Sequence, residues 1–272
     1  MKTLPWSFLV VTILGSSLAA CGNEHGSQTP PLRILVTNDD GYAAEGIDAI
    51  VAALAADPRN EVVVSAPSGN RSGSSDATGP SARCGDLSIT TSTTLSGYPA
   101  TAVNGCPADS VNYALANLYP AEAPPQLVVS GINEGQNISL PVATRLSGTV
   151  GAARTAARRG IPAIAASQGT PANNAQYDYS HGVASVLEWI EARRDELTAG
   201  GVVPVDVTNL NIPSCASGTE LRGTLIDVPL ATSPGNVLAN QDCASTLMDP
   251  SDDVEAFING FIVFSQVPLQ NG

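Results

Sequence analysis

Two adjacent carboxylates, Asp39 and Asp40, follow directly after an apolar run, within the turn-like tetrapeptide 38–41. Carboxylates that lie side by side repel each other unless a cation or a proton intervenes. Hard divalent cations such as Mg²⁺ bind one or two carboxylates together with neutral oxygens, which the side chains of Ser72 and Asn133 can supply. The pair therefore indicates a metal site, with an ordinary solvated turn as the alternative.

A second polar segment, Ser147-Gly148-Thr149, opens an alanine-rich stretch that predicts a helix over 147–159. Hydroxyls and free backbone N–H groups at a helix start form a binding site for anions, phosphate included. The alternative is a plain N-cap, which serine and threonine favour at this position. The two roles are compatible, since a capping residue can also face a ligand.

A third segment, 131–137, combines two glycines with two asparagines, which suggests a tight backbone near a ligand, with a plain loop as the alternative. Glu134 is expected to face solvent. His25 falls in a polar tether, and His181 is expected in the first turn of a helix with a structural role. Neither a serine-hydrolase elbow nor a dinucleotide fingerprint is present, and a Walker loop is impossible because Lys2 is the only lysine.

The elements that must position these segments form an alternating pattern. Apolar runs predict strands over 33–37, 62–66, 127–130, 161–166, 205–212 and 261–267, and apolar residues at helical spacing predict helices over 47–54 and 183–190 besides 147–159. Strands that alternate with helices predict an α/β fold with a mostly parallel sheet covered on both faces. Ligands bind outside the carboxyl ends of such strands. The polar segments 38–41, 70–73 and 130–133 each follow a strand, so we expect them to converge.

The stretch 214–251 is irregular, with Pro, Gly, Asn and two Cys. We interpret it as an excursion from the sheet, either a projecting hairpin or an oligomerisation arm.

The chain has 272 residues, enough for one α/β domain, and a formal net charge of −13 with a sequence pI near 4.3. A binder of DNA or RNA needs a positive footprint on the phosphates, so the composition argues against a nucleic-acid polymer as partner. An enzyme that acts on anions must offset this acidity locally, and a bound divalent cation would do so.

The first residues predict export. Lys2 gives a short basic start, an apolar stretch runs from Leu4 to Leu18, and Leu18-Ala19-Ala20-Cys21 resembles a bacterial lipobox. We therefore predict a lipoprotein signal peptide over 1–20, lipidation of Cys21 and a flexible tether over 21–31. The protein would be periplasmic or on the cell surface, touching a membrane only through this lipid. Plain secretion after Ala20 is the alternative.

The four remaining cysteines also fit an exported protein. Four thiols allow three pairings in an oxidising compartment. We predict Cys84–Cys106 and Cys215–Cys243, because each pair lies close in sequence, with four unpaired buried thiols as the alternative. Metal binding by these cysteines is not expected, since no Cys-x-x-Cys spacing occurs.

Taken together, the motifs resemble the SurE family, the survival-protein 5′/3′-nucleotidases. The segments that carry the resemblance are, in chain order, 34–41 (ILVTNDDG) with 46–47, 66–67 with 70–75 (NRSGSS), 105–111 (GCPADSV), 128–133 (VVSGIN), 147–150 (SGTV), 209–213 (NLNIP) and 267–269 (VPL). The resemblance spans 32–270, the predicted phosphatase domain being 32–272. Each motif is modest, but the series is specific.

The resemblance implies a Rossmann-like three-layer α/β sandwich with a C-terminal extension that builds homodimers or homotetramers. It implies one divalent ion per subunit, Mg²⁺ or Mn²⁺, and hydrolysis of nucleoside monophosphates, with short polyphosphate as a further substrate of some members. Its metal ligands would be Asp39, Asp40, Ser72 and Asn133. The residues around the phosphate would be Asn70, Gly131, Ser147, Gly148 and Thr149. Asp39 and Asp40 would be catalytic, and Asp39 is our candidate for positioning or deprotonating the attacking water.

The chain also departs from the family. Cys106 stands where the family has threonine and Ser110 where it has cysteine, and the signal peptide, the extra cysteines and the long stretch 214–251 are unusual. Two other functions stay open on the sequence. One is a broad-specificity acid phosphatase or exopolyphosphatase, and the other is a non-catalytic solute-binding lipoprotein, which would usually show two similar lobes.

Overall fold

The structure is a computed structural model that describes residues 30–199, 205 and 207–270. The predicted signal peptide over 1–20, Cys21 and all but the last two residues of the tether over 21–31 lie outside the described residues. Within those residues, no helix combines the length and the apolar character that a membrane crossing requires.

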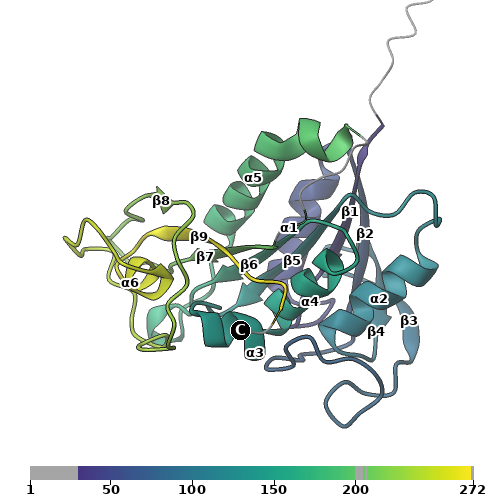
Figure 1. Ribbon diagram of the computed structural model, residues 1–272, viewed down its shortest axis with the longest axis horizontal. Coiled ribbons are helices and arrows are strands. Elements are labelled where there is room, and N and C mark those ends of the chain that lie inside the picture. Colours follow the sequence, from purple (N-terminus) through teal and green to yellow (C-terminus); the bar gives the residue numbers. More distant parts are fainter. Residues whose placement is uncertain (1–29, 200–204, 206, 271–272) are drawn as a thin grey trace, which may run out of the picture.

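A mixed sheet forms the centre of the fold (Figure 1). Within the described ranges it has nine strands, in the order β3-β4-β2-β1-β5-β6-β7-β9-β8. Neighbours run parallel except in the pairs β3–β4 and β7–β9. The bounds are β1 Leu32–Thr37, β2 Asn60–Pro67, β3 Ile89–Thr93, β4 Pro99–Val103, β5 Leu127–Glu134, β6 Ala163–Gln168, β7 Val207–Ile212, β8 Thr224–Leu225 and β9 Ile262–Gln266. The predicted mostly parallel α/β sheet is confirmed.

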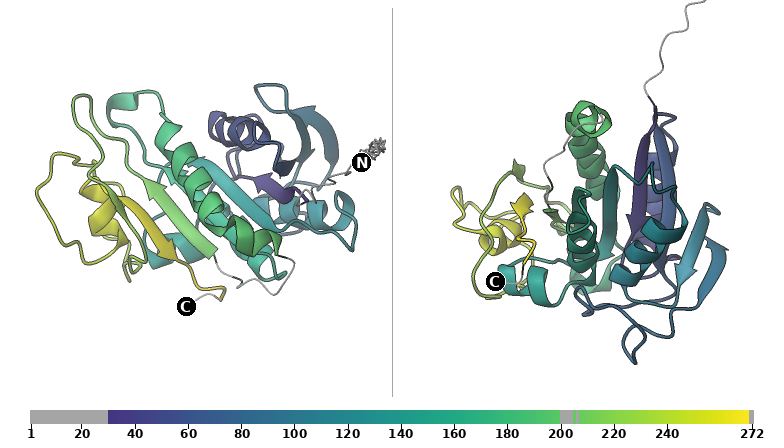
Figure 2. Two further views of the ribbon diagram at one scale, coloured as in Figure 1. Left: turned by 90° about the horizontal axis from the view of Figure 1, so that it is seen from above. Right: turned by 45° about the vertical axis from the view of Figure 1, so that its right-hand side comes forward.

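Helices cover both faces of the sheet (Figure 2). Their bounds are α1 Glu45–Ala55, α2 Pro107–Asn117, α3 Leu140–Arg145, α4 Gly148–Ala157, α5 Ser180–Thr198 and α6 Asp253–Ile258, with a 3₁₀ turn at Ala172–Asn174. The apolar residues of α1 and α5 share one core with the sheet, and those of α2 and α4 share another. The arrangement is the predicted three-layer sandwich.

The two cores follow from the alternation of side chains along the strands. In β1, Ile34 and Val36 enter the core under α1 and α5, whereas Leu35 enters the core under α2 and α4. Successive residues of a strand point to opposite faces, so a run of apolar residues suits a strand that is buried on both sides. Each such side chain contributes roughly 1.5–3 kcal/mol by leaving water, and together they fix the height at which β1 ends and Asp39 follows.

The prediction that a strand ends at Ser130 is wrong. Strand β5 continues through Glu134, and its register against β6 shifts between Ser130 and Asn133. The reason is that Ile132 is fully buried in the core under α1 and α5, so the polar segment keeps a strand's contacts with the sheet. Asn133 is therefore held by the sheet itself and not by a loop.

The excursion 214–251 is not a hairpin. Its regular structure within the described residues is β8, two residues that pair parallel with β9. Together with α6 it builds a separate small core around Phe257 and Ile138, at the yellow end of the molecule in Figure 1. The side chains of Ile226 and Leu238 stay exposed. Since β8 is the edge strand of the sheet, the stretch does not leave the sheet entirely, and its role as an oligomerisation arm stays a prediction.

Both predicted disulfides are present. Cys84 is bonded to Cys106, and Cys215 to Cys243. The first fastens the 79–88 loop to the start of α2, and the second fastens the excursion to the end of β7. The alternative of four unpaired thiols is thereby excluded for this structure.

Candidate metal and phosphate site

The carboxyl ends of β1 and β5 and the start of α4 surround a cavity of about 180 Å³. We call it the metal cavity. Four of the predicted site residues line it: Asp39, Ser72, Asn133 and Ser147. These side chains come from segments up to 108 residues apart, and the convergence expected at one edge of the sheet is confirmed.

Asp39 follows β1 and is 3% exposed. Its Oδ1 accepts a hydrogen bond from Thr149 Oγ1 at 2.6 Å. Burial raises the pKa of the Asp39 carboxyl, and the Thr149 hydroxyl together with backbone N–H groups at the start of α4 lowers it in part. The backbone oxygen of Asp39 accepts from Arg71 N at 2.6 Å, which joins the segment carrying Ser72 to the end of β1.

Asp40 lies beside the metal cavity and is not among the residues that line it. The backbone N–H of Glu134 donates to Asp40 Oδ2 at 3.0 Å, and Asn70 Nδ2 donates to Asp40 Oδ1 at 3.5 Å. Burial and the neighbouring charge of Asp39 raise the pKa of Asp40 to about 8, although the N–H of Glu134 opposes this shift. The two carboxylates are thus a coupled pair whose joint ionisation is unfavourable without added positive charge.

Ser72 and Asn133 are held in place by local hydrogen bonds. Ser72 N donates to Asn70 Oδ1 at 2.9 Å, so Asn70 bridges the segment of Ser72 and the carboxylate of Asp40. Asn133 Nδ2 donates to the carbonyl oxygen of Gly135 at 2.5 Å. This bond fixes the amide by its nitrogen and leaves the amide oxygen available as a ligand.

The N-cap predicted at the start of α4 is confirmed, and the anion-binding role of this helix start stays a prediction. Ser147 is the N-cap, since its Oγ accepts from Val150 N at 3.0 Å, and it also lines the metal cavity. Gly148 touches Asp39 so closely that a Cβ there would lie 2.8 Å from Asp39 Cβ, from Asp39 Oδ2 and from Ser74 Oγ. The Asp39 carboxylate therefore occupies part of the helix start that the sequence suggested for phosphate.

Of the five predicted phosphate-binding residues, Ser147 lines the metal cavity, whereas Asn70, Gly131, Gly148 and Thr149 do not. Thr149 is fully buried and directs its hydroxyl to Asp39. Gly131 lies within β5, where a Cβ would come 2.3 Å from the carbonyl oxygen of Ala166. Thr149 and Gly131 thus contact other parts of the protein in this structure. The role of each at a phosphate stays a prediction.

Ser74 is one residue that the sequence did not single out for a role of its own. It is 1% exposed, and its hydroxyl has no hydrogen-bond partner in the described part of the chain. The hydroxyl lies beside Asp39 across the small gap that Gly148 leaves. Its position in the segment 70–75 was the available signal, but burial of the hydroxyl could be known only from the fold.

Asn137 is a second such residue. It lines the metal cavity, its Nδ2 donates to Ser167 Oγ at 2.9 Å, and its backbone N donates to Asn211 Oδ1 at 2.7 Å. Asn209 Nδ2 donates to the carbonyl oxygen of Asn137 at 2.8 Å. Asn209 and Asn211 alternate along β7 and hence share a face, so they anchor the segment that follows β5 from two strands away.

The donor set suits a hard divalent cation. Asp39, Asp40, Ser72 and Asn133 offer oxygen atoms only, two of them anionic, as Mg²⁺ and Mn²⁺ sites do. Burial raises the pKa of both carboxyls, and a divalent ion bound between them would favour their ionised form. The residues present therefore fit a metal ion.

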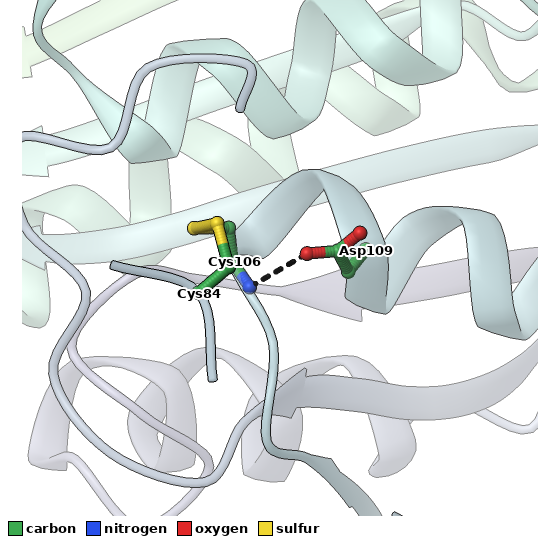
Figure 3. A group of neighbouring side chains, drawn as sticks. All are labelled: Cys84, Cys106 and Asp109. Carbon is green, nitrogen blue, oxygen red and sulfur yellow. Dashed lines mark hydrogen bonds between the residues drawn. A yellow bond between two sulfur atoms is a disulfide. The ribbon is translucent and has the colours of Figure 1, made fainter. Parts of the chain in front are cut away.

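The sulfur-containing group at Cys84, Cys106 and Asp109 is not a second metal centre (Figure 3). Its two sulfurs are bonded to each other, and a disulfide offers no thiolate. Asp109 Oδ2 accepts from Cys106 N at 3.0 Å and Oδ1 accepts from Gly79 N at 2.8 Å. The carboxylate therefore closes the first turn of α2 and holds the loop that the disulfide fastens.

Comparisons with known proteins identify a matching family and named relatives. Residues 34–229 match the family model "Survival protein SurE". The chain is 40% identical over 197 residues to the 5′-nucleotidase SurE of Methanothrix thermoacetophila, a match that covers 70% of this chain and 71% of that protein. It is 37% identical over 207 residues to the 5′-nucleotidase SurE of Methanopyrus kandleri, covering 74% and 72%.

A solved structure is also similar. The crystal structure of the SurE protein from Aquifex aeolicus superimposes with a TM-score of 0.64 at 23% identity, covering 88% of this chain and 94% of that one. At this identity the likeness concerns the fold alone.

Proposed function

Because this chain belongs to the SurE family, we propose that it is a metal-dependent nucleotidase that hydrolyses nucleoside 5′- and 3′-monophosphates to nucleoside and phosphate. Its 5′-nucleotidase activity follows from its relatives. The observation that carries the proposal is the convergence of Asp39, Ser72 and Asn133 on one cavity, with Asp40 beside it.

The proposed cofactor is one divalent ion per subunit, Mg²⁺ or Mn²⁺. Asp39, Asp40, Ser72 and Asn133 would hold it, and when bound it neutralises charge on the phosphoryl oxygens and lowers the pKa of water. The matching donor chemistry supports this set. The assay described below compares the activity that each of the two ions restores.

The protein's own groups have separate tasks in the proposed mechanism. Asp39 positions the attacking water and accepts its proton. The Ser147 hydroxyl and the backbone N–H groups at the start of α4 hold phosphoryl oxygens where negative charge develops. Asn70 keeps Asp40 and the segment of Ser72 together.

The decisive experiment is phosphate release from a panel of nucleoside 5′- and 3′-monophosphates, short polyphosphate and p-nitrophenyl phosphate. Each substrate is assayed after treatment with chelator and after addition of Mg²⁺ or Mn²⁺. We expect turnover of nucleoside monophosphates that chelation abolishes and metal restores. Equal turnover of all phosphoesters would indicate a broad-specificity acid phosphatase. Tight nucleotide binding without turnover would indicate a solute-binding lipoprotein and would refute the proposal.

We further propose that the protein is exported and lipid-anchored at Cys21, in the periplasm or on the cell surface. The lipobox-like tetrapeptide 18–21 and the two disulfides support this location. A Cys21→Ser variant that still partitions with membranes would refute the anchor.

The proposed assembly is a homodimer or homotetramer in which the excursion 214–251 contributes contacts. The exposed apolar side chains of Ile226, Leu238 and Met248 support this, since such residues are costly to leave in water. Light scattering of the purified protein tests it, and a monomer at micromolar concentration would refute it.

A further inference from the structure

A second cavity, of about 470 Å³, lies at the carboxyl ends of β6 and β7, where α5 begins. It is more than twice the volume of the metal cavity and has different walls. Gln168 closes β6, Pro213 and Ser214 follow β7, and the segment 175–181 forms the facing wall. Nothing in the proposed mechanism uses this cavity.

The two cavities share a rim. Gln168 is the register partner of Glu134, which lines the metal cavity, and Gly135 N donates to the Gln168 backbone oxygen at 2.8 Å. Gln136, also on the metal cavity, accepts from Thr170 N through its Oε1 at 3.1 Å. Neighbouring strands lie about 4.8 Å apart, so the cavities sit at adjacent strand ends, on either side of one hydrogen-bonded ridge.

Gln168, which lines this second cavity, carries an unsatisfied acceptor. The residue is 2% exposed, and its Nε2 donates to Ser214 Oγ at 3.0 Å. Its Oε1 is buried and has no hydrogen-bond partner among the described residues. A buried acceptor left without a donor is costly, so the site is prepared for a ligand that brings an N–H or O–H group.

The two carboxylates of the wall disfavour an anion, although His181 also lines the cavity. Asp178 and Glu220 line the cavity, and none of the described lining residues is Lys or Arg. Carboxylates would repel a phosphoryl group but accept hydrogen bonds from hydroxyls, as acidic residues do from ribose. The apolar side chains of Pro171 and Leu221 complete a wall that suits a flat, neutral ring system with polar edges.

We propose that this second cavity, the nucleoside cavity, binds the ribose and base of the substrate while the phosphoryl group lies in the metal cavity. The ligand extends across the ridge at Glu134 and Gly135. The Gln168 Oε1 accepts a donor of the nucleoside, and Glu220 accepts from a hydroxyl or amino group. This assignment rests on the proposed nucleotidase function and makes nucleotides better substrates than phosphoesters that lack a nucleoside.

Two variants test the assignment without touching the metal cavity. Ala175→Trp fills the nucleoside cavity from an exposed position, and Ala172→Trp is its control, because Ala172 is exposed in the same segment but does not line the cavity. Glu220→Gln removes one wall carboxylate, and its control is Glu188→Gln on the exposed side of α5. For each variant, kcat/KM is measured with adenosine 5′-monophosphate and with p-nitrophenyl phosphate.

The expected result concerns the ratio of the two kcat/KM values. Ala175→Trp lowers the nucleotide-to-nitrophenyl ratio by at least about tenfold, and Glu220→Gln lowers it by about three- to tenfold, the range for losing one pocket contact. Both controls keep the wild-type ratio. If the wild-type protein hydrolyses the nucleotide and both test variants keep its ratio, the assignment of the nucleoside cavity is refuted. The proposed nucleotidase function is not affected by that result. A wild-type protein without nucleotide turnover refutes the proposed function itself.

A binding measurement gives an independent readout. Adenosine carries no phosphate, so its binding to chelator-treated protein reports the nucleoside cavity alone. Calorimetry should show that Ala175→Trp weakens adenosine binding by at least about tenfold relative to Ala172→Trp. Equal affinity of these two variants for adenosine overturns the assignment.

Discussion

Gly148→Ala is the substitution that most directly tests the position of Asp39. A Cβ at residue 148 would lie 2.8 Å from Asp39 Cβ and from Asp39 Oδ2, whereas ordinary contact begins at 3.4 Å. The neighbours must therefore move by about 0.6 Å. The Ser74 hydroxyl can rotate away, but Asp39 Cβ is fixed to the end of β1, whose core residues hold it.

Two opposing effects decide the outcome for stability. Alanine is the better helix former by up to about 1 kcal/mol, and less at the first helical position. Forcing an extra methyl group into a packed interior costs about 1–3 kcal/mol. We expect the packing cost to exceed the helix gain, with a net loss of up to about 3 kcal/mol in the free energy of unfolding.

The effect on catalysis should be larger than the effect on stability. A misplacement of about 1 Å at a catalytic group can cost about a hundredfold in rate, so a displacement of Asp39 over half that distance should lower kcat/KM by about ten- to a hundredfold. The assay is phosphate release from adenosine 5′-monophosphate at saturating metal, with urea unfolding of the same sample.

Gly69→Ala is the matched control. Gly69 lies in the segment next to the metal cavity, but a Cβ there meets nothing within 4 Å, and its φ is not in the left-handed region. It should retain wild-type kcat/KM. If Gly148→Ala also stays within about twofold of wild type, the carboxylate of Asp39 does not depend on this contact, and the account of the site is refuted.

Three further predictions concern charge and cross-linking. Asp39→Asn should abolish phosphate release while circular dichroism stays native, with exposed Asp249→Asn as the control, and normal turnover would remove Asp39 from the mechanism. In metal-free protein the folded pKa of Asp40, about 8, exceeds its ordinary value of 3.8, so folded protein binds more protons. Stability should then fall as pH rises from about 4 to about 8. Asp40→Asn should make this decline smaller, and an unchanged pH slope in urea unfolding would contradict the raised pKa. Loss of Cys215–Cys243, which closes a loop of 28 residues, should cost about 3 kcal/mol, and an unchanged unfolding midpoint after replacement of both by serine would contradict it.

The sequence alone predicted the strands and helices that have a regular pattern of buried apolar residues. β1, β2, β6 and the helix α4 were predictable because their apolar runs are buried and regular. β3 was not, since its sequence ITTST is largely exposed and becomes a strand only by antiparallel pairing with β4. Pairing between segments is a property of the folded chain, so no local pattern indicates it.

The sequence predicted which segments come together at the candidate site, but not how their side chains are arranged. The ends of β1 and β5 determine the positions of Asp39 and Asn133, and parallel strands have these ends at the same edge of the sheet. The sequence cannot show that Asp40 bonds to the N–H of Glu134 and lies outside the metal cavity, because this depends on the register shift in β5. The nucleoside cavity was beyond reach for the same reason, as its walls come from 168–181 and 213–221.

The period of the β-strand explains how one edge of the sheet can hold two unlike cavities. Asp39 bonds to α4 through Thr149, whereas the next residue, Asp40, bonds to Glu134. In β6, Ser167 accepts from Asn137 of the metal cavity, whereas Gln168 lines the nucleoside cavity. Ser167 and Gln168 are successive residues of β6 and therefore point to opposite faces, so the end of this strand supplies one polar group to each cavity. A substrate with one anionic and one neutral end requires that division, and an inorganic phosphate does not.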